Sequence, residues 1–221
     1  MTALESKQLS EEPWLRALNV AVAAIGLLVT LPLLALIAVA IKLTCGGGPV
    51  IFRQTRVGLD RRRQGFPDGN RRRHHNIGGA PFEILKFRTM CVTSDSAQVW
   101  ATPDDARVTK LGRILRKCRL DELPQLVNVL LGDMNVVGPR PEQPEIFSKL
   151  RKFVPRYSRR QRVRPGITGW AQIHACYDRT IDDVKKKVRF DLEYIRRRSP
   201  AEDVRIMLRT LPVMFGRELG W

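Results

Sequence analysis

The hydrophobic residues of this chain are distributed unevenly, and one apolar run dominates the pattern. Residues 17–41 carry no charged side chain, and only Asn19, Thr30 and Pro32 interrupt the run notably. A stretch of this length can enter or cross a bilayer, and it is too long for the apolar part of a signal peptide. We therefore predict a polar tail at residues 1–13, a membrane-inserted helix at residues 14–45 and a single domain at residues 46–221.

Two membrane topologies fit this helix, because Pro32 lies near its middle. A proline removes one backbone hydrogen bond and bends a helix, while the Thr30 hydroxyl can satisfy a freed carbonyl. A kinked spanning helix and a re-entrant helix, which returns to its side of entry, are both consistent with that pattern. Basic residues after the run place the bulk of the chain on the cytoplasmic side. These residues are Lys42, Arg53, Arg56, Arg61, Arg62 and Arg63.

Beyond the apolar run, shorter patterns predict a helix-rich α+β domain. Residues 49–57 and 81–90 contain β-branched and aromatic residues and are expected to pair as a small β-hairpin. Helical spacing and a Thr109 cap predict helices over residues 110–118, 121–131, 182–198 and 200–211. The last helix is expected to lie at the membrane interface, with packing on the core as the alternative. Its apolar stripe comprises Val204, Met207, Leu208 and Leu211.

Charge and cysteine usage narrow the classes of function. The formal net charge of +17 implies anionic partners, namely nucleic acid, an anionic membrane surface or phosphorylated substrates. Nucleic-acid binding is disfavoured, because the basic residues are not interleaved with stacking aromatics. The cysteines form no CxxC pair, which argues against disulfides and zinc and fits a reducing compartment. We expect the basic stretch at residues 59–80 to be a solvated loop facing anionic lipids.

The candidate chemistry centres on two adjacent carboxylates, Asp121 and Glu122, which open an apolar segment. With Asp121 as N-cap, Pro124 falls in the first helical turn and Gly132 closes the helix. Free N–H groups and the helix dipole would then lower the pKa of Asp121, which suits a nucleophile better than a general base. The alternative is that the two carboxylates only cap the helix and carry no chemistry.

Three further motifs flank this pair. One, Lys86-Phe87-Arg88-Thr89-Met90, precedes it, and Gly138-Pro139-Arg140-Pro141 and Arg164-Pro165-Gly166-Ile167-Thr168-Gly169-Trp170-Ala171-Gln172 follow it. In the two later motifs an arginine lies beside proline, which lowers the cost of ordering a guanidinium on a phosphate. The helix predicted over residues 110–118 also delivers Arg116 close to Asp121.

Taken together and in this order, the motifs closely resemble those of the bacterial sugar transferases, which are monotopic phosphoglycosyl transferases. The resemblance implies transfer of a sugar phosphate from a UDP-sugar to polyprenyl phosphate at the cytoplasmic face of the bacterial inner membrane. It implies a ping-pong mechanism, in which Asp121 attacks the β-phosphate and releases UMP before the lipid accepts the sugar phosphate. It also implies a re-entrant helix that breaks at Pro32.

The resemblance assigns an expected role to each motif residue. Asp121 and Glu122 are expected to be catalytic, with Glu122 holding Mg²⁺, or Mn²⁺ in its place. The expected phosphate-binding residues are Arg88, Arg116, Arg140 and Arg164. The other motif positions are Lys86, Asp133, Pro139, Pro141, Thr168 and Gln172.

Two features depart from the family pattern. The connection at residues 59–80 is much longer than the tight turn of the family, and Arg119 stands where members usually carry a small hydroxyl residue. A non-catalytic membrane scaffold is the alternative from another class, but it leaves Asp121 and Glu122 without a role. A homodimer is an open alternative to a monomer.

Overall fold

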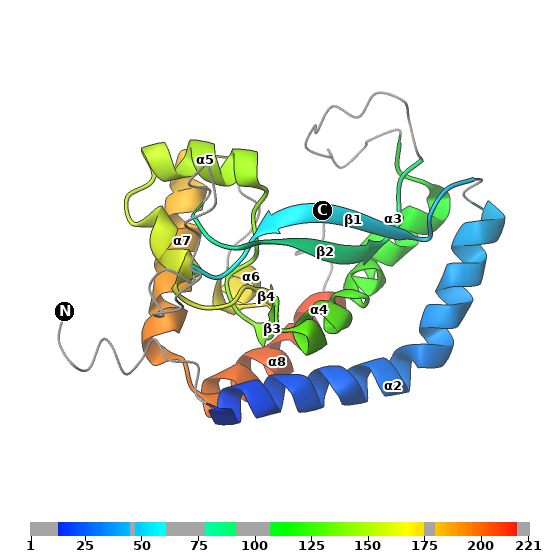
Figure 1. Ribbon diagram of the computed structural model, residues 1–221, viewed down its shortest axis with the longest axis horizontal. Coiled ribbons are helices and arrows are strands. Elements are labelled where there is room, and N and C mark those ends of the chain that lie inside the picture. The colour runs from blue at the N-terminus through cyan, green and yellow to red at the C-terminus, as the bar shows by residue number, and fades with distance from the viewer. Residues whose placement is uncertain (1–12, 45–46, 61–77, 92–106, 175–179, 216–221) are drawn as a thin grey trace.

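The computed structural model describes residues 13–44, 47–60, 78–91, 107–174 and 180–215 (Figure 1). Of the predicted polar tail only Pro13 is described, and most of the basic stretch at residues 59–80 lies outside the described residues. The described part combines helices with two small two-stranded sheets. This arrangement confirms the predicted helix-rich α+β class.

The apolar run forms one helix, α2, from Pro13 to Thr44. Its mean hydropathy reaches 2.7 over an 18-residue window, of which only 11% is buried. Figure 1 shows that α2 bends near its middle, so that a first arm lies along the bottom of the molecule and a second arm rises beside it. Pro32 lies inside the helix and explains the bend, because its ring removes the bond to the carbonyl of Leu28. The Thr30 hydroxyl bonds to the Gly26 carbonyl at 2.6 Å, so it does not serve the carbonyl that Pro32 frees.

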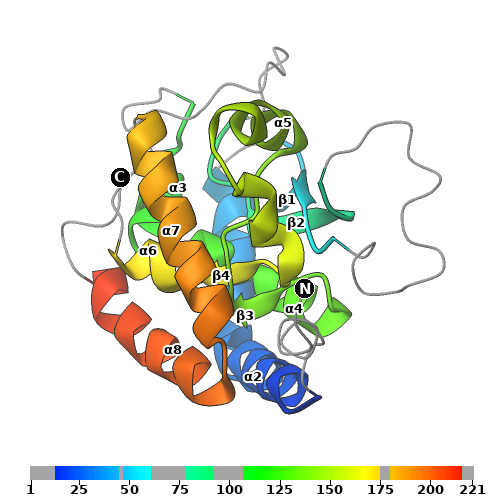
Figure 2. The ribbon, with the colours of Figure 1, turned by 90° about the vertical axis from the view of Figure 1, so that its left-hand side faces the viewer.

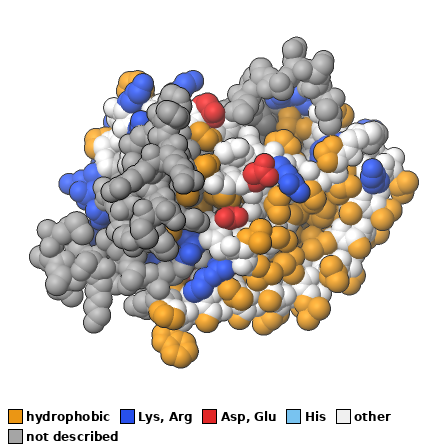
Figure 3. Space-filling model, viewed as in Figure 1, with side chains coloured by type: hydrophobic (Ala, Val, Ile, Leu, Met, Phe, Trp, Pro, Cys, Tyr) orange, Lys and Arg blue, Asp and Glu red, His pale blue; other side chains and the backbone are white. Residues whose placement is uncertain are grey.

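Both arms of α2 pack against the rest of the chain. In the first arm, Ala23 joins a core cluster with Val129 and Met134, and Asn19 is fully buried. The Asn19 carboxamide accepts a hydrogen bond from the backbone N–H of Val136 at 2.6 Å. In the second arm, Ile37 and Ile41 pack on Phe87 and Leu115. The convex side remains exposed and forms a broad apolar area (Figure 3).

Two strand pairs form the sheets. The predicted hairpin is confirmed, since β1 (Ile51–Val57) and β2 (Pro81–Phe87) pair antiparallel with Ile51 opposite Phe87. A parallel pair, β3 (Asn135–Val137) with β4 (Gly166–Thr168), was not predicted. Strands of three residues are too short to produce a periodic pattern. This second pair joins the two proline-flanked arginine motifs at the centre of the molecule (Figure 1).

The helices after β2 surround these sheets. Helix α3 (Lys110–Lys117) follows the predicted cap, whose Thr109 hydroxyl accepts a hydrogen bond from the Gly112 N–H at 2.9 Å. A short 3₁₀ helix, η2 (Leu120–Glu122), precedes α4 (Gln125–Leu131). The others are α5 (Pro144–Phe153), the 3₁₀ helix η3 (Tyr157–Arg162), α6 (Trp170–His174), α7 (Ile181–Arg197) and α8 (Pro200–Phe215).

Helix α8 packs on the core by a face that includes only Met207 of the predicted apolar stripe. Ile206 and Asp203 are fully buried, and Ile206 belongs to the same core cluster as Ala23. Val204, Leu208 and Leu211 are 41%, 63% and 54% exposed. Met207 packs against this core cluster, whereas the other three stripe residues face outward on α8, which lies beside the first arm of α2 (Figures 1 and 2).

Candidate active site

A tight turn between α3 and α4 carries the two candidate carboxylates. Arg119 adopts a left-handed backbone conformation, with φ of 56°, and η2 follows it directly. Pro124 then stands at the N-cap of α4, and its side chain makes no cap hydrogen bond. The predicted helix therefore ends at Gly132 as expected, but the prediction that Asp121 is its N-cap is wrong. The reversal at Arg119 places Asp121 and Glu122 before α4, where they are nearly buried.

Glu122 is surrounded by cationic side chains from distant parts of the sequence. Its Oε1 atom lies 3.0 Å from Lys86 Nζ of β2 and also accepts a hydrogen bond from Arg140 Nη2. Arg140 Nη1 donates to Oε2 at 3.3 Å, and Arg119 Nη1 lies 4.0 Å from Oε1. Burial alone would raise the pKa of Glu122, but Arg140 and Lys86 hold it well below its usual value. Glu122 is therefore ionised throughout the physiological pH range.

Asp121 has a different electrostatic environment from its neighbour. Burial raises its pKa, and so does the negative charge of Glu122. Lys86, Arg140 and Arg116 act in the opposite direction but do not cancel the increase. The expected lowering is therefore wrong, because Asp121 does not cap α4 and the nearest cations are engaged by Glu122. Its pKa no longer favours a nucleophile over a general base.

The loop that carries Arg140 is fixed by backbone bonds. Gly138 N–H donates to the Thr168 carbonyl at 2.9 Å, and Gly166 N–H donates to the Pro139 carbonyl at 3.0 Å. The two proline-flanked motifs therefore bind each other. A Cβ atom on Gly138 would lie 2.5 Å from the Arg164 carbonyl oxygen, so this contact requires glycine.

A buried ionic network contacts the backbone of this loop through Arg160. Arg160 of η3 is 1% exposed and donates to the Arg140 carbonyl at 2.9 Å and to Asp191 Oδ2 at 2.6 Å. It also donates to the Tyr157 hydroxyl at 3.0 Å. Glu142 joins the network through Lys187 at 2.9 Å and Arg160 at 3.7 Å. Sequence reasoning missed these residues, because they lie far apart along the chain and none of them belongs to a motif with a stated role.

Only some of the predicted phosphate-binding arginines gather at Asp121. The positive charge of Arg116 lowers the pKa of Asp121, and Arg116 also donates to Thr89 Oγ1 at 2.9 Å. Arg88 instead donates to the Gly47 carbonyl at 2.7 Å. Arg164 donates to the Gly132 carbonyl at 2.7 Å, at the far end of α4. Helix α4, about 10 Å long at 1.5 Å per residue, lies between Gly132 and the turn that carries Asp121.

Arg56 of β1 is a further cation beside Arg140, which the sequence indicated only as one of the basic residues after the apolar run. Its Nη1 atom donates to the Pro141 carbonyl at 3.2 Å. Burial lowers the pKa of Arg56 to about 10, with a further contribution from Arg140.

The other motif positions make hydrogen bonds within the fold. Thr168 shares a hydrogen bond with Thr210 at 2.8 Å, Gln172 donates to the Ile167 carbonyl at 3.1 Å, and the Asp133 N–H donates to the Asn128 carbonyl at 3.0 Å.

The acidic residues of the site are few, which limits how it can hold a metal. Among the described residues, no group of three or more histidine, cysteine, aspartate or glutamate side chains is close enough to bind one. Mg²⁺ commonly uses one or two carboxylates together with substrate phosphates and water. The ionised Glu122 beside Asp121 fits that mode, provided that a diphosphate supplies the other oxygens.

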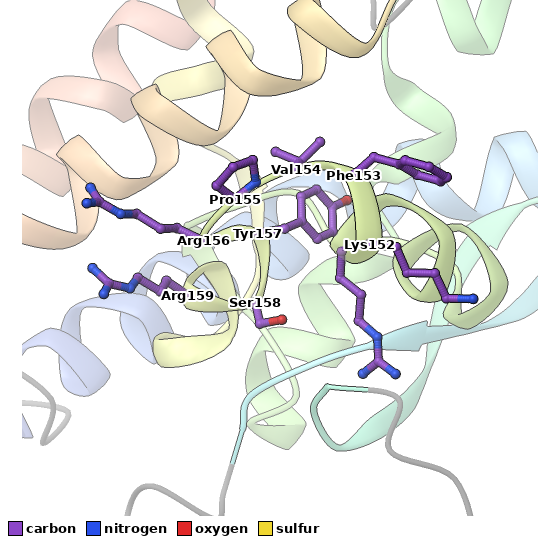
Figure 4. A pocket seen from close by; sticks show the side chains of 9 residues that line it. Lys152, Phe153, Val154, Pro155, Arg156, Tyr157, Ser158 and Arg159 are labelled. Carbon is purple, nitrogen blue, oxygen red and sulfur yellow. The ribbon is translucent and has the colours of Figure 1, made fainter.

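One hollow in the described part of the chain lies away from these carboxylates. It has a volume of about 220 Å³ and is lined by residues 151–159, between α5 and η3. Figure 4 shows the Arg156 and Arg159 side chains side by side, pointing away from Lys152 on the opposite side. These cations do not converge on one point, so the hollow is not arranged to hold an anion.

Comparison with known proteins places the chain among transferases. The family model described as bacterial sugar transferase matches residues 10–217. The chain is 42% identical over 199 residues to a UDP-glucose:undecaprenyl-phosphate glucose-1-phosphate transferase of Escherichia coli, covering 89% of this chain and 39% of the relative. A protein of the same name from Caulobacter vibrioides is 42% identical over 200 residues, covering 89% and 68%. A UDP-N-acetylgalactosamine-undecaprenyl-phosphate N-acetylgalactosaminephosphotransferase of Aeromonas hydrophila is 40% identical over 197 residues, covering 89% and 42%. The chain thus spans about two fifths of the length of the first and third relatives.

Proposed function

Because the chain belongs to the bacterial sugar transferase family, we propose that it transfers a sugar 1-phosphate from a UDP-sugar to polyprenyl phosphate. The observation that carries this proposal is the buried Asp121–Glu122 pair beside Lys86, Arg140 and Arg116. Phosphoryl transfer needs a nucleophile together with fixed positive charge around the transferred group. The site supplies both, next to an apolar helix that gives access to a lipid substrate.

In the proposed mechanism, Asp121 is the nucleophile. Its carboxylate attacks the β-phosphorus of the UDP-sugar, the bond from that phosphorus to the bridging oxygen breaks, and UMP leaves. An oxygen of polyprenyl phosphate then attacks the same phosphorus, which releases Asp121 and gives the polyprenyl diphosphate sugar. Arg140 and Lys86 keep Glu122 ionised beside the reacting carboxylate. Arg116 lies within electrostatic reach of Asp121 and can neutralise charge on the transferred phosphate.

Glu122 would hold Mg²⁺, or Mn²⁺, together with oxygens of the diphosphate. The ion supplies positive charge that neutralises the diphosphate and favours the ionised form of a nearby carboxylate. This requirement agrees with the raised pKa of Asp121 in the free protein, because Asp121 must be deprotonated to attack. Lys86 and Arg140 share Oε1, so the less engaged Oε2 is the oxygen available to a metal.

A direct mechanism is the competing version, and the raised pKa of Asp121 supports it. Asp121 would then be a general base that deprotonates the acceptor, and both substrates would have to be bound together. The two mechanisms differ in what happens before the lipid is added. Only the covalent route releases UMP from a UDP-sugar alone.

The deciding experiment uses the detergent-held chain, radiolabelled UDP-sugar and no lipid. The covalent route predicts release of about one UMP per active enzyme, with the label retained on Asp121. Asp121→Asn should abolish both signals, and excess EDTA should suppress them. Asp182→Asn is the matched control, because Asp182 is exposed on α7 and pairs only with Lys185 among the described residues. Release of UMP only after polyprenyl phosphate is added, with no label on the protein, would refute the covalent route.

We further propose that α2 is re-entrant and that the catalytic domain lies on the cytoplasmic face of the bacterial inner membrane. The packing of α2 supports this topology. Ala23 of the first arm and Ile41 of the second arm contact core clusters of the same domain. A spanning helix would carry one arm away from that domain, across the bilayer. The Pro32 bend instead forms the tip of a shallow V, whose exposed convex side is apolar (Figure 3).

A further inference from the structure

Three arginines surround one indole where α6, α7 and α8 meet. The guanidinium carbons of Arg197, Arg205 and Arg209 lie 4.9, 6.0 and 5.8 Å from the ring centroid of Trp170. The His174 ring lies against the same indole at a centroid distance of 3.9 Å. Cations over an indole gain from the ring quadrupole, which offsets part of their mutual repulsion. We refer to Arg197, Arg205 and Arg209 as the Trp170 arginine cluster.

The carboxylates around this cluster do not balance its charge. Glu193 accepts from Trp170 Nε1 at 3.3 Å and pairs with Arg197 at 3.0 Å. Glu202 lies 3.5 Å from Arg205 and 3.9 Å from Arg197. In the described part of the chain, no carboxylate pairs with Arg209. Three guanidinium groups therefore face two carboxylates, and one positive charge remains for an external anion.

The cluster borders the exposed apolar stripe of α8. Arg205 directly follows Val204, and Arg209 directly follows Leu208, so the two arginines flank the stripe on one side. Their side chains remain accessible, since that of Arg205 is 51% exposed. If the stripe enters the apolar part of a bilayer, the adjacent guanidinium groups reach the level of the lipid phosphates. Helix α8 also lies beside the first arm of α2 (Figures 1 and 2).

We propose that the Trp170 arginine cluster is a binding site for the headgroup phosphate of an anionic phospholipid, with the α8 stripe in contact with its acyl chains. This proposal rests on the membrane placement of the proposed function. The apolar stripe favours a lipid over a soluble phosphate, because Leu208 and Leu211 would otherwise stay in water. Polyprenyl phosphate is a less suitable occupant, because the cations that act on Asp121 are Lys86, Arg140 and Arg116, none of which belongs to the cluster.

The test compares lipid binding by the full chain and by charge-matched variants. Native mass spectrometry of the detergent-solubilised protein would follow its titration with phosphatidylglycerol and, separately, with phosphatidylcholine. The double variant Arg205→Gln with Arg209→Gln removes two charges from the cluster. The control, Arg156→Gln with Arg159→Gln, removes two exposed charges at the hollow between α5 and η3. Circular dichroism and the UMP-release assay of each variant monitor folding and the proposed function independently of lipid binding.

The cluster variant should bind phosphatidylglycerol more weakly, by about fivefold per arginine and therefore about twenty-five-fold in total. The control should bind phosphatidylglycerol with the affinity of the original chain. The affinity for phosphatidylcholine should differ little among the three proteins. A conservative variant, Arg205→Lys with Arg209→Lys, should recover most of the affinity if charge is what the lipid recognises.

Equal loss in the cluster variant and the control would overturn the proposal, because it would show a general effect of net charge. So would unchanged binding in a folded cluster variant. A third overturning result is a titration in which polyprenyl phosphate binds at the cluster and phosphatidylglycerol does not. Loss of UMP release with normal phosphatidylglycerol binding would instead count against the proposed function alone.

Discussion

At the scale of single residues, Asp121 and Glu122 show how two neighbours acquire opposite properties. Arg140 and Lys86 hydrogen-bond to Glu122, and the pKa of its carboxyl is low although burial alone would raise it. Asp121 is next to it, receives the repulsion of that fixed charge and has a raised pKa. Glu122 therefore stays negative, whereas Asp121 depends on what binds beside it. This asymmetry is the physical basis for assigning them different roles.

Arg160 is expected to position Arg140, because it binds the Arg140 carbonyl and Asp191 with the same guanidinium. Arg160→Lys keeps the positive charge beside Asp191 but cannot span both partners. We expect turnover to fall by roughly tenfold to a hundredfold, since small misplacements of a catalytic cation are costly. Steady-state kinetics would check this, with the exposed neighbour Arg159→Lys as control. Equal turnover in the two variants would contradict a positioning role.

Glu142 should make the fold sensitive to acid. Burial alone would raise its pKa, but Lys187 and Arg160 lower it to about 2 from a usual value of 4.5. A lowered pKa means that this stabilisation is complete above pH 4.5 and is lost as the pH falls towards 2. From the size of the shift, the contribution at neutral pH is about 3 kcal/mol.

We therefore expect Glu142→Gln to lower the melting temperature clearly at pH 7 and hardly at all near pH 2. Thermal unfolding in detergent across this pH range would measure the difference between the variant and the original chain. Glu145→Gln provides a control, since Glu145 is exposed on α5. A difference that stays constant as the pH falls would show that Glu142 is not the group that titrates.

At the scale of secondary-structure elements, α2 is long and apolar enough to enter a membrane and also supports β3. Asn19 satisfies the Val136 N–H, and the Tyr194 hydroxyl donates to the Val137 carbonyl at 3.2 Å. Strand β3 leads directly into the Gly138 loop that presents Arg140. The first arm of α2 is therefore part of the structure that holds the site, rather than a detached anchor.

Asn19→Leu should destabilise this junction, because it leaves the buried Val136 N–H without an acceptor. The expected cost is about 1–3 kcal/mol of unfolding free energy, with a parallel loss of turnover. Thr30→Val is the matched control, since among the described residues the Thr30 hydroxyl bonds only to the Gly26 carbonyl of its own helix. Thermal unfolding in nanodiscs would compare the two variants. The supporting role of α2 would be excluded if Thr30→Val were as harmful as Asn19→Leu.

At the scale of the whole molecule, the bend in α2 lets one continuous helix contact opposite sides of the domain while its convex side stays apolar (Figure 1). Exposed leucines and valines occur on both α2 and α8, and these two helices contact each other, as expected for a domain resting on a bilayer. The buried ionic network around Arg160 joins η3 and α7 to the loop that carries Arg140.

The re-entrant topology predicts that both ends of α2 face the cytoplasm. A cysteine introduced at position 2 should react with a membrane-impermeant maleimide only after the cells are opened. The cysteines of the natural sequence are first replaced by serine, and the protein without any cysteine gives the background labelling. Labelling of position 2 in intact cells would show that α2 spans the membrane and would refute the re-entrant proposal.

The sequence alone was sufficient for features that depend on neighbouring residues. The apolar helix, the β1–β2 hairpin, α3 with its Thr109 cap and α7 all follow from periodicity and capping. Contiguous motifs were enough to identify the family. The start of α4 was not predictable in this way, because the left-handed turn at Arg119 involves a residue type that carries no turn signal.

Only the tertiary structure decided which charges act on which carboxylate. Lys86 and Arg140 reach Glu122 from different elements, whereas Arg164, in an equally rigid motif, lies at the far end of α4. The same holds for the raised pKa of Asp121, which depends on burial and on that pairing. Coulomb energies and desolvation depend on distance and burial in space, and residue spacing along a chain encodes neither once the contacts are long-range.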